Sequence, residues 1–141
     1  MNDKNSGRVH WSFWVIGAAM LVWNALGCIN FLVQMNPHML EVYRESEQAI
    51  IENRPIWVTG AFAIAVFAGA IGCLLLMFRK SFSHYVLIAS MMGVVVTMVH
   101  ALNAGIDFGL GEILGVIVMP LLVAVFLVWY SKQAKAKGWI R

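Results

Sequence analysis

Residues 56–78 read IWVTGAFAIAVFAGAIGCLLLMF, a long apolar run without a charged side chain. About 20 apolar residues are enough to cross roughly 30 Å of hydrocarbon as an α-helix. Inside a bilayer the backbone has to satisfy its own hydrogen bonds, so such a run has to be helical. Three further apolar runs lie at about residues 11–33, 85–102 and 113–130. The sequence therefore predicts an all-α integral membrane protein with four transmembrane helices.

The composition agrees with a membrane protein. The 141 residues are 61% hydrophobic and only 12% charged, with a formal net charge of +3. A soluble domain carries about 25% charged residues, so lipid is expected to solvate much of this surface. The length suits one domain, and we predict a single four-helix unit over residues 1–141. No basic patch is interleaved with exposed aromatic residues, so membrane lipids are expected as partners and nucleic acid is not.

Positively charged residues are unevenly distributed among the connections between the runs. Eight of the ten lie before the first run, between the second and third, or after the fourth: Lys4, Arg8, Arg79, Lys80, Lys132, Lys135, Lys137 and Arg141. The other two, Arg44 and Arg54, share residues 34–55 with four glutamates. Because cytoplasmic connections carry an excess of Lys and Arg, we predict that both termini are cytoplasmic. Residues 34–55 then form an outer loop, and residues 131–141 a basic cytoplasmic tail.

The start of the outer loop, residues 35–39, reads MNPHM. Asn36 followed by Pro37 is typical of a helix cap with proline at the first helical position. We therefore predict one or two short helices at the outer membrane interface. Met35, His38 and Met39 are soft ligands that could face one Cu(I) ion. Three residues without a second cluster do not suffice to predict a metal site, so no metal is expected.

Small residues recur along the second run. Ala61, Ala65, Gly69 and Cys73 follow one another at four-residue spacing. Small side chains on one helix face let two helix backbones approach closely, which favours a packing stripe; a dimer or ligand face is the alternative. Cys73 and Cys28 lie on antiparallel helices at depths that differ by roughly 18 Å. A disulfide needs Cα atoms within about 7 Å, so the two cysteines are predicted to be unpaired packing residues.

Five polar residues fall within the runs or at their ends: Asn24, Asn30, Thr97, His100 and Glu112. Polar groups inside a membrane are default candidates for function. Most of the five fall in the outer half of the predicted helices, which suggests a polar pocket open to the outside. The alternative is structural. Asn24 and Thr97 would then bond between helices, His100 would be neutral and bonded to Asn30 or Glu112, and Glu112 would be a solvated helix N-terminus.

Four short motifs are WSFW at 11–14, LVWNALGC at 21–28, RPIW at 54–57 and GCLLL at 72–76. In these the chain resembles a family of small four-helix bacterial inner-membrane proteins of unknown function, which are often labelled sugar transporters. The resemblance extends over nearly the whole length, although residues 35–39 depart from the family pattern. It implies four helices in a bacterial inner membrane, and it carries over no catalytic or substrate residues.

Two functions follow from these observations. No Ser-His-Asp arrangement, Gly-rich phosphate loop or paired-carboxylate site is visible, so neither an enzyme nor a cofactor is expected. Small multidrug exporters depend on a glutamate in their first helix. Residues 11–33 contain no acidic residue, so this chain is not expected to be one of them. The small-residue stripe and the few polar groups favour an accessory or assembly subunit of a larger membrane complex. The polar pocket and the family label favour a small homo-oligomeric transporter or binding protein for a neutral solute such as a sugar.

Overall fold

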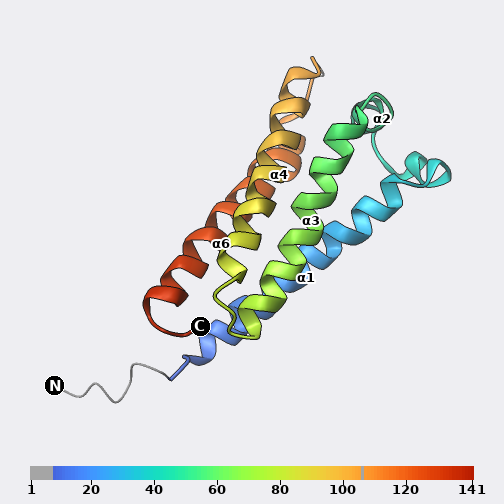
Figure 1. The fold of residues 1–141 in the computed structure, drawn as a ribbon. Coiled ribbons are helices and arrows are strands. Elements are labelled where there is room, and N and C mark those ends of the chain that lie inside the picture. Colours follow the sequence, from blue (N-terminus) through green and yellow to red (C-terminus); the bar gives the residue numbers. More distant parts are fainter. Residues whose placement is uncertain (1–7, 106) are drawn as a thin grey trace.

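The computed structural model describes residues 8–105 and 107–141, and within these ranges it is all-helical without strands. Four helices are long and apolar enough to cross a membrane, which confirms the predicted class (Figure 1). They are α1 (Trp11–Gln34), α3 (Ile56–Met77), α4 (Ser83–Asn103) and a last helix composed of α5 (Leu110–Glu112), the π-helical η3 (Ile113–Val118) and α6 (Met119–Ala136). Lys4, counted above toward the membrane orientation, lies outside the described residues.

The last helix is longer than the predicted run 113–130, because it begins at Leu110 and ends at Ala136. Much of the predicted basic tail is therefore helical. The local sequence SKQAKA is rich in good helix formers and has no helix breaker before Gly138. Gly138 has a φ of 68°, and a glycine in this conformation is a common way to end a helix.

The predicted outer loop contains two short helices, η2 (Pro37–Val42) and α2 (Glu45–Glu52). The Asn36 side chain accepts a hydrogen bond from the His38 backbone N–H at 3.1 Å, and Pro37 is the first helical residue. This confirms the helix start predicted from the sequence, although the helix is of the 3₁₀ type. Met35, His38 and Met39 are all exposed along the turn from α1 into η2.

Close helix packing depends on glycines that face a neighbouring backbone. Helix α3 packs against both α1 and α4, and α4 also packs against α6. A Cβ atom at Gly93 of α4 would lie 2.5 Å from the Ala61 carbonyl oxygen and 2.8 Å from the Ala65 nitrogen of α3. A Cβ atom at Gly72 of α3 would lie 2.6 Å from the Leu87 side chain. The α3–α4 pair can therefore pack this closely only because these positions have no side chain.

The bundle is closed at the end where the chain terminates. Phe13 is fully buried and stacks on Tyr130, with ring centroids 6.3 Å apart. The Arg141 N–H donates to the Arg79 carbonyl oxygen at 2.7 Å, and Arg79 Nε donates to the Trp139 carbonyl oxygen at 2.7 Å. These bonds attach the last residues to the α3–α4 connection. The C-terminus and the first turn of α1 consequently lie at the same end of the bundle (Figure 1).

Candidate ligand-binding cavity

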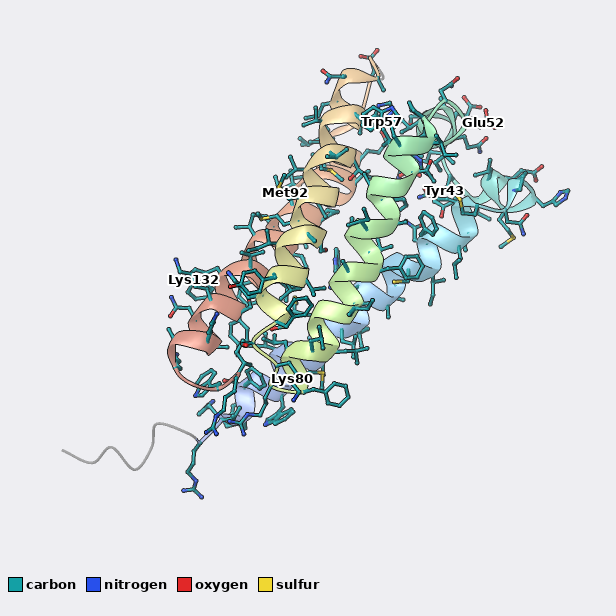
Figure 2. All side chains as sticks on the ribbon, viewed as in Figure 1. Tyr43, Glu52, Trp57, Lys80, Met92 and Lys132 are labelled. Carbon is teal, nitrogen blue, oxygen red and sulfur yellow. The ribbon has the colours of Figure 1, made fainter. Side chains whose placement is uncertain are left out.

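A cavity of about 430 Å³ lies between the helices in the half of the bundle away from Phe13. Each of the four long helices contributes to its wall, and Ile50 and Ile51 of α2 line it at the outer-loop end. Figure 2 shows Tyr43 and Glu52 at this end of the molecule and Lys80 at the opposite end. The volume falls within the range of about 300–1,000 Å³ that is typical of small-molecule sites. The cavity is therefore large enough for a ligand.

Four of the five polar residues singled out from the sequence, Asn24, Asn30, Thr97 and His100, line this one cavity. The polar faces of α1 and α4 therefore meet the same space. Glu112, the fifth residue, does not belong to the wall. The surroundings of Glu112 explain why it lies apart from the other four.

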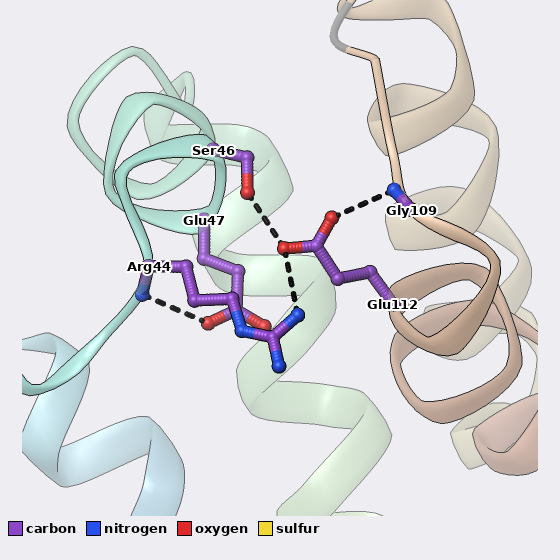
Figure 3. Close-up of polar contacts among 5 residues, drawn as sticks. All are labelled: Arg44, Ser46, Glu47, Gly109 and Glu112. Carbon is purple, nitrogen blue, oxygen red and sulfur yellow. Dashed lines mark hydrogen bonds and ion pairs between the residues drawn. The ribbon is translucent and has the colours of Figure 1, made fainter.

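Glu112 is held by the outer loop (Figure 3). One carboxylate oxygen accepts a hydrogen bond from the Ser46 hydroxyl at 2.8 Å and lies 3.5 Å from Arg44 Nη1. The other accepts from the Gly109 backbone N–H at 3.0 Å, at the start of the helix. Glu112 lies in the first turn of the helix, as the structural interpretation expected, but it is only 9% exposed and not solvated. The carboxylate is covered because α2 packs over this helix start.

The polar side chains deep in the cavity wall bond to groups of the protein: Asn24 and Ser90 bond to α3, whereas Thr97 bonds within its own helix α4 and not between helices as expected. Asn24 Nδ2 donates to the Met20 carbonyl oxygen at 2.9 Å and to Cys73 Sγ at 3.6 Å. The Thr97 hydroxyl donates to the Val94 carbonyl oxygen at 2.8 Å, and the Ser90 hydroxyl donates to the Ala65 carbonyl oxygen. Their hydrogen-bond donors are satisfied by protein groups, so this part of the wall offers a ligand few free donors.

Asn30 and His100 differ from the bonding predicted for them. The Tyr43 hydroxyl donates to Asn30 Oδ1, which ties the outer loop to α1. The His100 ring lies edge-on to Trp57, with ring centroids 6.2 Å apart. A bond from His100 to Asn30 or Glu112 is not formed, because Asn30 is engaged by Tyr43 and Glu112 by α2. His100 faces the cavity without a hydrogen bond to another described residue.

The small-residue stripe faces two different helices. Ala61 and Ala65 lie under Gly93 of α4. Gly69 lies under Asn24 of α1, where a Cβ atom would overlap the amide. Cys73 receives the bond from Asn24, and its thiol is free, as is that of Cys28. In the structure the stripe therefore occupies the contacts of α3 with both neighbours.

Sequence reasoning missed Arg54 as a cavity residue. Its guanidinium is placed by three groups: Nε donates to Thr59 Oγ1 at 3.2 Å, Nη1 donates to Gln34 Oε1 at 2.9 Å, and the group lies 5.2 Å from the centroid of the Phe62 ring. Nη2 is buried and has no acceptor among the described residues. Burial lowers the pKa of Arg54. The available signal was a cation immediately before an apolar run, in the loop that the sequence predicts to be external.

The remaining wall is largely apolar and continues to the outside of the bundle. Val58, Phe62 and Val66 of α3 and Val123 and Leu127 of α6 line the cavity. On the α1 side, the wall includes side chains that are also exposed on the surface, namely Trp23 (38% exposed) and Leu26 (59% exposed). The cavity is therefore not sealed from the surroundings of the helices.

Within residues 8–105 and 107–141, no three His, Cys, Asp or Glu side chains are grouped so that they could hold a metal ion.

Comparison of the chain with protein-family models, with curated protein sequences and with solved structures finds no match. The resemblance to the small bacterial four-helix family therefore stays a prediction.

Proposed function

We propose that the protein binds a small molecule in the cavity between its helices and acts as a small binding or transport protein. The observation that carries this proposal is the cavity of about 430 Å³, whose apolar wall is combined with a few polar groups. Ligand sites have this composition, because apolar area contributes affinity and a few polar groups orient the ligand. Four helices rarely enclose a complete transport pathway, so transport would require a homo-oligomer.

We further propose a bacterial inner membrane with both termini in the cytoplasm. Arg79, Lys80 and Arg141 lie at the closed end of the bundle, and the glutamates of residues 34–55 belong to the opposite end. This asymmetry is the one expected when the basic end is cytoplasmic. The cavity then lies in the outer half of the membrane, and its ligand is taken from outside the cell or from the membrane.

The proposal is tested by native mass spectrometry of the protein, extracted from its own membranes in a mild detergent. We expect a small bound mass on the natural protein. Gly115 lines the cavity, and a Cβ atom there would meet nothing within 4 Å, so a side chain can begin there; Gly115→Leu should occupy part of the cavity and remove the bound mass. Gly60 is equally free of neighbours but does not line the cavity, so Gly60→Leu is the matched control.

A second candidate is a subunit of a larger membrane complex, and one observation favours it. In an apolar 18-residue segment of α1, only 6% of the residues are buried within the bundle, compared with 28% in the corresponding segments of α3 and of α4. Trp14, Val22 and Ile29 are among the exposed side chains of α1. Lipid or another protein could cover this face. A stoichiometric protein partner in the same spectra, with no small bound mass, would support the subunit and contradict the ligand-binding proposal.

A further inference from the structure

We propose that the ligand of the cavity is an amphiphile with an anionic oxygen head group and a single apolar chain, whose head is bound by Arg54. This inference rests on the proposed binding function and names its ligand class. It is carried by three features: a half-buried cation with an unused donor at the outer end, an apolar wall below it, and an opening toward the side of the bundle.

The head-group site follows from the state of Arg54. Nε and Nη1 already have acceptors in Thr59 and Gln34, whereas Nη2 is buried and has none. Among the described residues no carboxylate forms an ion pair with this guanidinium. A buried cation without a counter-ion is unfavourable, and a carboxylate or phosphate matches the fork of the guanidinium. An anion at this position would supply both the missing acceptor and the missing charge.

The positions of the neighbouring groups support an anion at Arg54. Thr59, Gln34 and Phe62 hold the guanidinium in place, so little side-chain freedom remains to be lost on binding. Glu47 is the one described acid that lines the cavity. Its carboxylate accepts from the Arg44 backbone N–H at 3.4 Å and forms no ion pair with Arg54. Arg54 and Glu47 are therefore both charged groups of the wall without an ion pair among the described residues, and of the two it is Arg54 that has a buried, unused donor.

The chain site follows from the remainder of the wall. Between Gln34 and Asn24, α1 descends by about 15 Å. The lining also includes the apolar side chains Val58, Phe62, Val123 and Leu127 from α3 and α6. The donors of Asn24 and of the other deep polar residues are bonded to protein groups. A sugar would leave most of its hydroxyl groups without partners here, whereas an alkyl chain needs none.

The opening favours a ligand that comes from the bilayer. Trp23 and Leu26 of α1 line the cavity and are also exposed on the outside of the bundle. Contact between α1 and α6 is concentrated at the other end, around Phe13 and Tyr130. An alkyl chain lying in the bilayer can enter from this side while its head stays near the outer end, where Arg54 lies.

The test is equilibrium binding of radiolabelled dodecanoate to the full-length protein in nanodiscs of zwitterionic lipid, with empty nanodiscs as the blank. Unlabelled dodecyl phosphate, dodecanol and dodecyltrimethylammonium serve as competitors of equal chain length. We expect saturable binding, displacement by dodecyl phosphate, and at least tenfold weaker displacement by the alcohol and the cation. The relative strength of carboxylate and phosphate then distinguishes a free fatty acid from a phosphate-bearing lipid.

Variants assign the head group to Arg54. Arg54→Gln removes the charge and should weaken dodecanoate binding at least tenfold, and Arg54→Lys, which keeps the charge but not the fork, should weaken it less. Arg44→Gln removes one charge from the same end of the molecule, and Arg44 does not line the cavity, so binding should be unchanged. The competitor series on the natural protein decides the question even if Arg54→Gln does not fold.

Each other outcome would overturn the inference in a recognisable way. If all four amphiphiles bind equally and Arg54→Gln has no effect, the cavity binds apolar chains but does not select an anion. Tighter binding of dodecyltrimethylammonium would contradict the inference and indicate Glu47 as the head-group site instead. If no amphiphile binds while native mass spectra still show a bound mass, the inference fails and the proposed function stands. If neither is observed, both fail.

Discussion

The Glu112 carboxylate accepts a hydrogen bond from the Ser46 hydroxyl at 2.8 Å, across 66 positions of the chain. This contact joins α2 to the start of the last helix (Figure 3). Tyr43 makes a second attachment, to Asn30 of α1. The outer loop is thereby held at two points over the end of the bundle where the cavity lies.

Removing the Ser46 hydroxyl should loosen α2. Ser46→Ala leaves Glu112 with Gly109 and with Arg44, whose side chain is 73% exposed and therefore contributes little. We expect amide hydrogens of residues 45–52 to exchange several-fold faster, whereas those of α3 should keep their rates. Ser81→Ala, at the opposite end, is the control. Unchanged exchange over residues 45–52 would show that other contacts hold the outer loop.

A methyl group at Gly93 should separate α3 from α4. Its Cβ would lie 2.5 Å from the Ala61 carbonyl oxygen and 2.8 Å from the Ala65 nitrogen, and backbone atoms cannot move aside cheaply. We expect Gly93→Ala to lower the free energy of unfolding by about 1–3 kcal/mol, measured by unfolding with SDS in mixed micelles. Gly60→Ala, where a Cβ meets nothing within 4 Å, should be neutral or slightly stabilising. Equal stability of the two variants would contradict the close α3–α4 packing.

The proposed membrane orientation is testable with single cysteines. In a background with Cys28→Ala and Cys73→Ala, Asn53→Cys places a thiol on the acidic connection, and Lys132→Cys places one at the basic end; both positions are exposed. A membrane-impermeant maleimide should label Asn53→Cys in intact cells, and Lys132→Cys only after the membrane has been opened. The reverse pattern would place the cavity on the cytoplasmic side.

The element boundaries show how far sequence reasoning reaches for this protein. The runs 11–33 and 56–78 became helices that end within one residue of the predicted positions. The prediction succeeded because a single apolar segment inside a bilayer can satisfy its backbone hydrogen bonds only as a helix. The last helix is the exception: residues 131–136 leave the apolar run but keep helix-forming side chains, so hydropathy underestimates its length.

The site was anticipated only in part. Asn24, Asn30, Thr97 and His100 were found by their polarity within apolar runs, and they line one cavity. Arg54 was not found, because it lies between α2 and α3 in a loop whose charges were considered only for orientation. Its importance depends on which acceptors reach it, and Gln34 is 20 positions away in the chain.

Sequence by itself determined the four helices, their order and the small residues at their contacts, because each of these depends on a local balance of apolar and polar side chains. Tertiary structure alone decided the roles of Glu112 and Arg54. The Glu112 carboxylate is covered and attaches the outer loop, and Arg54 lines the cavity, only because α2 folds over the ends of the helices. These roles depend on hydrogen bonds between groups that are far apart in the chain, and the local sequence does not indicate which of these groups come into contact.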